Sequence, residues 1–286
     1  MKGILLAGGT GSRLWPLTRS TSKQLLPIYD KPMVYYPLST LMLAGIREIL
    51  VITTRIDQAN YKKLLGDGSK LGISLDYLIQ SEPKGLAEAF IIGEKFIADK
   101  EVTMILGDNL FYGVGLGTHL SRIQFDGGCR IFISSVANPE NYGVLEFDNQ
   151  DKPLSIIEKP RNPNSSWAVT GLYMFDSQVV EIAKSVKPSA RGELEITSVI
   201  EHYLTTQQLK FSKLGRGDTW LDTGTPSSLI DASNFVKTIE DRTGLKVACL
   251  EEIAWTNGWI DSNQLGRLAS EVGPEYREYL LKLIGP

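Results

Sequence analysis

The chain begins with a short apolar run that leads directly into a glycine-rich segment, KGILLAGGTGSR at residues 2–13. Residues 4–7 are apolar and form a run long enough for one buried strand, and glycines follow at positions 8, 9 and 11. Because glycine has no Cβ, its backbone N–H groups can lie close to a ligand. A helix that begins just after such a loop favours an anion at its N-terminus. The segment therefore predicts a strand that ends in a phosphate-binding loop, with Arg13 at its rim.

Two better-known glycine loops do not fit these residues. A dinucleotide fingerprint, G-x-G-x-x-G, needs a third glycine at the position that Leu14 occupies. The P-loop, G-x-x-x-x-G-K-[ST], needs a Gly-Lys-Ser/Thr sequence that does not follow here. The missing third glycine argues against an NAD-dependent dehydrogenase. A tight turn that binds no ligand is the simplest alternative for this loop.

Composition and charge describe an ordinary globular chain, with 42% hydrophobic and 22% charged residues. The net charge of −3 gives no reason to expect a nucleic-acid partner. Cys129 and Cys249 provide neither a disulfide framework nor the spacing of zinc ligands. The N-terminal apolar run is too short for a signal peptide, and no run approaches the roughly 18 apolar residues of a membrane span. We therefore expect a soluble cytoplasmic protein.

Strands and helices alternate through the first part of the chain. The pattern predicts strands at 48–53, 73–79 and 102–106 and helices at 33–43, 60–65 and 85–96. This alternation predicts a mostly parallel sheet, in which ligands bind at the carboxyl ends of the strands. The glycine loop, Gln80 and Asp108 each follow a strand, so we expect them to lie at one edge of that sheet.

From residue 130 the pattern changes to short strands that are separated by turn residues. Strands are predicted at 130–136, 143–147, 154–158, 168–175 and 209–214, and helices at 193–204, 226–240 and in the last 40 or so residues. The whole pattern predicts an α/β protein. Its Rossmann-like, mostly parallel but mixed sheet is flanked by helices and joined to a β-rich region and a C-terminal helical region.

Two aspartates follow strand-like segments, Asp108 in LGDN and Asp222 in WLDTGT. A carboxylate in such a position suits Mg²⁺, a hard cation that takes few protein ligands and keeps water and substrate phosphates as the others. An aspartate that caps a turn is the alternative at each position. One aspartate in each half of the chain fits a metal shared in a cleft between the halves.

Positive side chains lie in loops or at element ends, where Arg can clamp a phosphate and Lys can act as a point charge. These residues are Arg13, Lys23, Lys159 and Arg191. A solvated surface charge is the alternative for each. Glu158 precedes Lys159 at a strand end, where the pair suits a sugar hydroxyl and a sugar phosphate. The sequence has no Ser/His/Asp or Cys/His arrangement that would support nucleophilic catalysis.

A set of motifs spans nearly the whole chain and resembles a known family. The motifs are LAGGTGSRLWPLT with Lys23-Gln24 following, LGDNLFYG at 106–113, NYGVLEF at 141–147, EKP at 158–160, VTGLYMFD at 169–176, ARGELEIT at 190–197 and WLDTGT at 220–225. In this order they resemble the sugar-nucleotide pyrophosphorylases, and most closely the members that use dTTP and glucose 1-phosphate.

The resemblance implies a role for each candidate residue. The nucleotide would be bound by Leu6, Gly8, Gly9, Thr10, Gly11, Ser12, Gln24, Gln80, Gly85 and Asn109. The catalytic cations would be Arg13, Lys23 and Lys159. The sugar phosphate would be bound by Gly143, Glu158, Val169, Tyr173 and Arg191. The implied cofactor is Mg²⁺, held by Asp108 and Asp222.

The resemblance also implies a reaction and an assembly. A phosphate oxygen of glucose 1-phosphate would attack the α-phosphorus of dTTP in line and displace pyrophosphate, giving dTDP-glucose for the dTDP-rhamnose pathway. Residues 1–225 would form the nucleotidyltransferase core, with a nucleotide-binding half to about residue 128 and a sugar-phosphate-binding half after it. Residues 226–286 would make subunit contacts in a homotetramer, and a second nucleotide-sugar site would allow feedback control.

Two other functions stay open at this point. The first is a transferase of the same fold that uses UTP or another sugar phosphate, because uracil and thymine differ by one methyl group worth roughly 1–3 kcal/mol. The second is a nucleotide-sugar sensor without activity. Such a sensor is expected to lack Arg13, Lys23 or one of the aspartates, whereas all of them are present.

Overall fold

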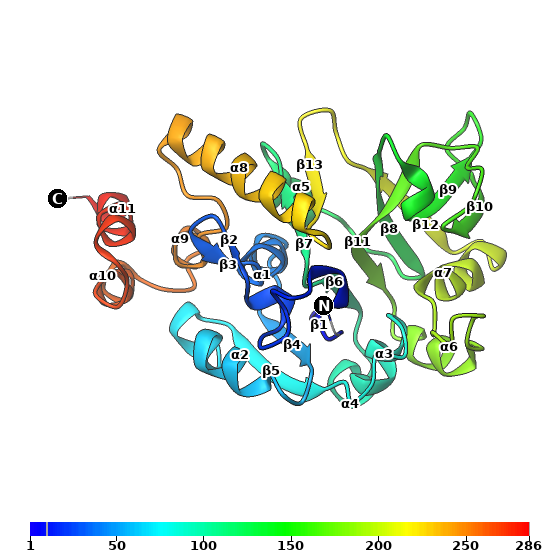
Figure 1. Cartoon of the computed structure of the whole chain (residues 1–286), viewed down its shortest axis with the longest axis horizontal. Helices are drawn as coiled ribbons and strands as arrows, with labels where there is room; N and C mark the ends of the chain where they lie inside the picture. Colours follow the sequence, from blue (N-terminus) through cyan, green and yellow to red (C-terminus); the bar gives the residue numbers. More distant parts are fainter. Residues whose placement is uncertain (10, 286) are drawn as a thin grey trace.

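The computed structural model describes residues 1–9 and 11–285, and within those ranges a nine-stranded sheet forms the centre of the molecule (Figure 1). Its strands are β1 (Lys2–Ala7), β4 (Glu48–Thr53), β5 (Ser74–Ile79), β6 (Val102–Leu106), β8 (Cys129–Ser135), β9 (Gly143–Phe147), β10 (Pro153–Glu158), β11 (Trp167–Phe175) and β12 (Leu209–Lys213). Neighbours follow the order β10-β9-β11-β6-β1-β4-β5, with β8 paired to β11 and β12 to β8.

The N-terminal part of the sheet is parallel, as predicted. Strand β1 lies between β4 and β6, β5 lies beside β4, and all four run in one direction. Ile4 and Leu6 pack into the hydrophobic cluster on one face, and Leu5 and Ala7 pack into the cluster on the other. Because both faces are covered, β1 has a continuous apolar sequence. Parallel strands end at the same edge, and that edge carries the segments after β1, β5 and β6.

The C-terminal part of the sheet is mixed. Strand β11 runs antiparallel to β6 and joins the two parts, and it also pairs antiparallel with β8 and β9. Strand β10 is antiparallel to β9, and β12 is parallel to β8. The predicted α/β class, with a mixed sheet flanked by helices, is therefore confirmed.

Helices cover both faces of the sheet. They are α1 (Tyr35–Leu43), α2 (Gln58–Leu65), α3 (Glu88–Ile92), α4 (Glu94–Ile97), α5 (Leu116–Ser121), α6 (Val179–Ser185), α7 (Ile196–Thr205), α8 (Pro226–Thr243), α9 (Leu250–Thr256), α10 (Ser262–Ala269) and α11 (Pro274–Ile284). Helices α3, α6 and α7 contribute to one cluster, whereas α1, α9 and α10 contribute to the other. In Figure 1, α10 and α11 lie at the end of the molecule opposite β9 and β10. None of the described helices is both long and apolar enough to cross a lipid bilayer.

A two-stranded ribbon outside the main sheet joins distant parts of the chain. It consists of β7 (Asn109–Tyr112) and β13 (Thr219–Asp222), which run antiparallel with Asp222 opposite Asn109. Asp108 immediately precedes β7, so the ribbon places Asp108 and Asp222 at the same end. Helix α8 begins with a capping box at Thr225 and Ser228 and packs on β13 and on β2 (Pro27–Ile28), which pairs with β3 (Lys31–Pro32).

Several predicted elements were wrong in their bounds. The single helix at 85–96 is two short helices, α3 and α4, separated at Gly93, where a Cβ would crowd Ile4 and Leu50 at about 3.2 Å. The helix at 193–204 begins only at Ile196, so Arg191 lies in the preceding loop. No α-helix follows the glycine loop either; a 3₁₀ turn at Ser12–Leu14 takes its place. The apolar spacing was correct in the first two cases, but close packing and loop contacts set the ends of the helices.

Candidate active site

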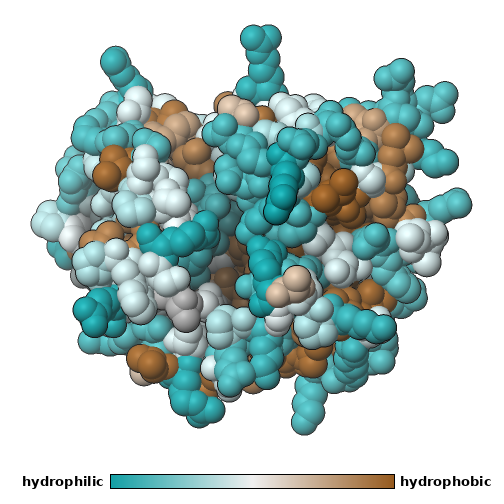
Figure 2. Space-filling model, turned by 45° about the vertical axis from the view of Figure 1, so that its right-hand side comes forward, coloured by the Kyte–Doolittle hydropathy of each residue, from teal (hydrophilic) through white to brown (hydrophobic). Residues whose placement is uncertain are grey.

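A cleft of about 320 Å³ lies where the two parts of the sheet meet. Residues after β1, β5 and β6 line one side, and residues of β9, β10 and β11 line the other. Figure 2 shows a hollow near the middle of the face that it draws, with hydrophilic residues around its rim and hydrophobic residues in its depth. The expected convergence of the strand ends is therefore present in the structure.

The cleft brings together most of the residues that sequence reasoning selected. Its lining includes Leu6, Gly8, Gly9, Arg13, Lys23, Gln24, Gln80, Gly85, Asp108, Asn109, Gly143, Glu158, Lys159, Val169, Tyr173, Arg191 and Asp222. Gly11 and Ser12 do not line it, and Thr10 lies outside the described residues. Gly11 has a φ of 59°, and its carbonyl accepts a hydrogen bond from the hydroxyl of Thr18 at 2.7 Å. The second half of the glycine loop is therefore folded onto the following turn.

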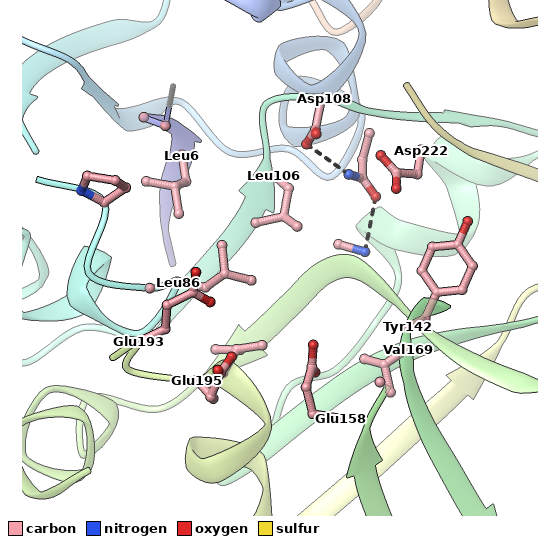
Figure 3. Close-up of a pocket in the computed structure, with 18 of the residues that line it drawn as sticks. Leu6, Leu86, Leu106, Asp108, Tyr142, Glu158, Val169, Glu193, Glu195 and Asp222 are labelled. Carbon is pink, nitrogen blue, oxygen red and sulfur yellow. Dashed lines mark hydrogen bonds between the residues drawn. The ribbon is translucent and has the colours of Figure 1, made fainter. Parts of the chain in front are cut away.

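Asp108 and Asp222 lie close together at one end of the ribbon of β7 and β13. Asp108 follows β6 and forms an ion pair with Lys23, and its other carboxylate oxygen accepts a hydrogen bond from Asn109 Nδ2 at 3.2 Å. The backbone carbonyl of Asp108 accepts two hydrogen bonds from Thr223, at 3.0 Å from the amide and 2.7 Å from the hydroxyl. Figure 3 shows the side chains of Asp108 and Asp222 near each other in the same part of the cleft. The ribbon β7–β13 thus holds the two acids as neighbours.

The two carboxylates have opposite electrostatic environments. Burial raises the pKa of Asp108, but the Lys23 ammonium outweighs it and leaves the pKa below the ordinary value. Burial raises the pKa of Asp222, and the neighbouring charge of Asp108 raises it further against the opposing effects of Lys23 and Arg13. Two crowded carboxylates, of which only Asp108 is paired with an ammonium group, form a site that one more cation would stabilise.

The donor set fits a hard divalent cation. Among the described residues, no three or more His, Cys, Asp or Glu side chains gather as a complete metal site. The two aspartates therefore supply an incomplete set of oxygen ligands. This is the arrangement that Mg²⁺ accepts, because it keeps several waters or substrate phosphates in its coordination sphere.

Arg13 and Lys159 line the cleft from opposite halves. Arg13 lies beside Gly224, where a Cβ would be 2.8 Å from Arg13 Nη2 and 3.0 Å from a carboxylate oxygen of Asp222. The bare backbone of Gly224 thus leaves room for both groups. Lys159 has a φ of 46°, a left-handed conformation that an L-residue adopts at a cost of roughly 1–3 kcal/mol. Its strained backbone directs a half-exposed ammonium group to the rim.

Arg191 faces acidic side chains in this structure. Its Nη2 is 2.9 Å from Glu195 Oε1 and 3.4 Å from Glu158 Oε1, and its Nε donates to Glu195 at 3.2 Å. Figure 3 shows Glu158, Glu193 and Glu195 along the same side of the cleft. Sequence reasoning missed both Glu193 and Glu195. The i,i+4 spacing of Arg191 and Glu195 in ARGELEIT was the signal that could have found the second of them.

Backbone contacts join the two sides of the cleft at Leu194. Its N–H donates to the carbonyl of Lys84 at 2.7 Å, and its carbonyl accepts from the N–H of Ala87 at 3.1 Å. Gly85 lies between them with a φ of 106°, and a Cβ there would overlap the Leu194 backbone. The segment after β5 is therefore tied to the segment before α7, and only glycine fits at the crossing.

Matches with known proteins agree with this geometry. The family model described as nucleotidyl transferase matches residues 2–239. The chain belongs to the nucleotidyl transferase family. It is 54% identical over 286 residues to the glucose-1-phosphate thymidylyltransferase of Neisseria meningitidis, with 99% of each chain covered. The glucose-1-phosphate thymidylyltransferase of Mycolicibacterium smegmatis is 56% identical over 285 residues, again with 99% of each chain covered.

Solved structures agree with the fold of this nucleotidyl transferase. A Bacillus anthracis protein described as a glucose-1-phosphate thymidylyltransferase, solved with sucrose, has a TM-score of 0.76 and 39% identity. That match covers 82% of this chain and 94% of the other. A UDP-glucose pyrophosphorylase complexed with UDP-glucose has a TM-score of 0.73 and 26% identity, covering 83% and 98%. The family resemblance drawn from the motifs is therefore confirmed.

Other cleft residues of this nucleotidyl transferase were absent from the sequence-based selection. They are Pro83, Leu86, Leu106, Asn141, Tyr142, Gly171, Glu193, Glu195, Ile196 and Trp220. Most of them lie inside the quoted motifs, beside a residue that was selected. Asn109 shows that a position inside a motif does not by itself indicate ligand binding. Its Oδ1 accepts hydrogen bonds from Trp220 Nε1 and from the N–H of Gly171. Much of its hydrogen bonding therefore holds the protein together.

Replacing Gly85 with alanine should destabilise the nucleotidyl transferase fold. A left-handed φ costs an L-residue roughly 1–2 kcal/mol, and overlap with the Leu194 backbone adds roughly 1–3 kcal/mol. We expect a free energy of unfolding lower by about 2–5 kcal/mol, measured by chemical denaturation. Gly192→Ala is the matched control, because Gly192 has a φ of 77° but no described atom within 4 Å of a new Cβ. Equal losses in the two variants would contradict the role of the Leu194 contact.

Proposed function

We propose that this nucleotidyl transferase moves a thymidylyl group from dTTP to glucose 1-phosphate, giving dTDP-glucose and pyrophosphate. One observation carries the proposal: a single cleft holds two adjacent aspartates together with Arg13, Lys23 and Lys159. Its relatives named glucose-1-phosphate thymidylyltransferase, at 54–56% identity over nearly their full length, support the choice of substrates. The charge pattern suits two phosphorylated substrates in one site.

The chemistry requires two polyanions to approach each other. At about 4 Å, two like unit charges repel by about 4 kcal/mol when the effective dielectric constant is about 20. The attacking phosphate oxygen of glucose 1-phosphate already carries negative charge, so no side chain has to remove a proton. Arg13, Lys23 and Lys159 offset the repulsion and stabilise the negative charge on the oxygens of the transferred group. The protein therefore contributes position and charge, with no covalent intermediate.

The proposed cofactor is Mg²⁺, with Asp108 and Asp222 as its protein ligands. When bound, it would neutralise phosphate charge and polarise the phosphoryl oxygens. Lys23 pairs with Asp108, so it also keeps that carboxylate ionised and available at low pH.

The two substrates are assigned to opposite sides of the cleft. Leu6, Gln24, Gln80, Gly85, Asn109 and the glycine loop, including Thr10, Gly11 and Ser12, are proposed for the nucleotide. Gly143, Glu158, Val169, Tyr173 and Arg191 are proposed for the sugar phosphate. Burial raises the pKa of Tyr173, which keeps its hydroxyl protonated as a hydrogen-bond donor. Arg191 would exchange Glu195 and Glu158 for a phosphate, since both partners are carboxylates that it contacts now.

The motif resemblance also supports a homotetramer in the cytoplasm, with the C-terminal helices in the subunit contacts. Exposed apolar side chains on α8 and α11, Ile230 at 61% and Leu281 at 43%, suit such contacts. Size-exclusion chromatography with light scattering tests the assembly, and a mass of one chain would contradict it.

A pyrophosphate-release assay tests the proposed reaction. Glucose 1-phosphate, dTTP and Mg²⁺ are expected to be required together, so omission of any one should abolish release. No release from the complete mixture would contradict the proposal.

Use of UTP is the second candidate activity, favoured by the structural likeness to a UDP-glucose pyrophosphorylase. The methyl group that distinguishes the two pyrimidines is worth roughly 1–3 kcal/mol, so we expect dTTP to be preferred to UTP by roughly 10–200-fold. Turnover compared with dTTP, UTP, CTP and ATP measures this preference. A higher kcat/KM for UTP would make the uridylyltransferase the better description.

A further inference from the structure

Gln80 is held at its nitrogen end by an acid outside the cleft. Its buried side chain follows β5, and Nε2 donates a hydrogen bond to Glu88 Oε2 at 2.7 Å. Glu88 is the first residue of α3 and does not line the cleft, whereas Gln80 does. An ionised carboxylate accepts hydrogen bonds and donates none, so only the nitrogen of the amide can face it. Glu88 therefore determines which end of the Gln80 amide is turned away from the cleft.

The oxygen end of the same amide lies over the glycine loop. An alanine at Gly8 would place its Cβ on top of Gln80 Oε1, closer than real Cβ contacts allow. Among the described residues, no donor forms a hydrogen bond to Oε1, and both Gly8 and Gln80 line the cleft. The carbonyl oxygen and the second N–H of the Gln80 amide are therefore free to contact a ligand, and they present an acceptor next to a donor.

We propose that Glu88 is a positioning residue that sets base selectivity by fixing the orientation of the Gln80 amide. The inference rests on the proposed function, in which Gln80 lies on the nucleotide side of the cleft and its free amide edge contacts the base. An acceptor beside a donor complements the imide edge of thymine or uracil, where an N–H stands next to a C=O. Cytosine presents the opposite order, an unprotonated ring nitrogen next to an amino group. To bind cytosine equally well the amide would have to turn over, which would set Oε1 against the Glu88 carboxylate.

A merely structural role for Glu88 makes a different prediction. The Glu88 carboxylate also accepts a hydrogen bond from the N–H of Lys84 at 3.3 Å, so it helps to hold the segment before α3. Loss of that contact alone would lower the stability of the protein and weaken the binding of every nucleotide to the same extent. The ratio of activities on two pyrimidines separates the two roles, because only a fixed amide distinguishes thymine from cytosine.

The test measures kcat/KM with dTTP and with dCTP by pyrophosphate release from the full chain with glucose 1-phosphate and Mg²⁺. In E88L, which has no acceptor, we expect the dTTP:dCTP ratio to fall by about 10-fold or more. E88D keeps a carboxylate, which accepts hydrogen bonds and donates none, so its ratio should stay within about 3-fold of the wild type. E82L is the matched control, because Glu82 lies on the same segment, is exposed and, within the described part of the chain, pairs only with Lys84, at 3.2 Å.

Each outcome decides the inference. An E88L protein with an unchanged ratio overturns it, as does an E88D protein that loses as much selectivity as E88L. If E88L does not fold, E88A replaces it, since alanine is the best helix former and also has no acceptor. Failure of the wild type to use dTTP is a different result: it removes the proposed function, and it is read from the wild-type assay alone.

Discussion

Replacing Asp222 with asparagine should lower turnover by about 10²–10³-fold and at the same time make the metal-free protein more stable. The loss of rate follows because one of the two carboxylates proposed for the cation is removed. The gain in stability follows because burial and the Asp108 charge raise the pKa of Asp222, so its ionised form is unfavourable in the folded protein. A functional group that destabilises its own fold is a common feature of active sites.

The difference in stability between D222N and the wild type should depend on pH. The folded-state pKa of Asp222 is raised above its unfolded value, so the folded protein holds this proton more tightly. The resulting stabilisation is full below the unfolded pKa and is lost as pH rises through the folded pKa. The melting temperature of EDTA-treated D222N should therefore exceed that of the wild type most clearly at neutral pH, and the difference should shrink as pH falls.

Pyrophosphate release measures the loss of turnover, and thermal unfolding with and without Mg²⁺ measures the change in stability. Added Mg²⁺ should raise the melting temperature of the wild type and leave that of D222N nearly unchanged. Asp231→Asn is the control, because Asp231 is an exposed aspartate of α8 outside the cleft. A metal-free D222N protein that is less stable than the wild type would show that the carboxylates do not repel each other as described.

Arg13→Ala should lower turnover by about 10²-fold or more without unfolding the protein. One lost transition-state contact of this kind costs roughly 3–4 kcal/mol of activation free energy. The fold should lose little, since Arg13 is exposed on a 3₁₀ turn and forms no salt bridge with a described residue. Steady-state pyrophosphate release and a thermal melt are the two measurements. A lysine at this position keeps the charge but not the bidentate geometry, so R13K should recover only part of the rate.

Arg19→Ala provides the matched comparison for this variant. Arg19 is also exposed, lies six positions further along the chain and does not line the cleft. Its removal changes the net charge by the same amount and should leave turnover nearly unchanged. Wild-type turnover in R13A, or equal losses in the two variants, would refute a specific role for Arg13.

Continuous apolar runs were the most dependable guide to the fold. The predicted strands 48–53, 102–106 and 143–147 have the same bounds in β4, β6 and β9. Their side chains are buried largely because they are hydrophobic, so the local sequence pattern and the tertiary packing both favour a strand at these residues. The predicted helix at 85–96 failed because Gly93 lies against β1 and β4, a contact that no local pattern encodes.

Much of the candidate site could also be predicted from the sequence. Strand ends carry Gln80 and Asp108, and parallel strands bring their carboxyl ends to one edge. The ribbon of β7 and β13 was not predicted, because each strand is only four residues long. Without that ribbon, the expected closeness of Asp108 and Asp222 rested on their positions after strand-like segments and on the motif resemblance.

The family, the parallel direction of the first strands and the side chains at their ends could all be predicted from the amino-acid sequence. These follow from hydrophobic spacing and from motifs whose residues are neighbours along the chain. Three features could be recognised only in the folded structure: the repulsion between Asp108 and Asp222, the close contact between Gly85 and Leu194, and the orientation of the Gln80 amide. All three depend on through-space distances between groups on different elements, and the linear order of residues does not specify those distances.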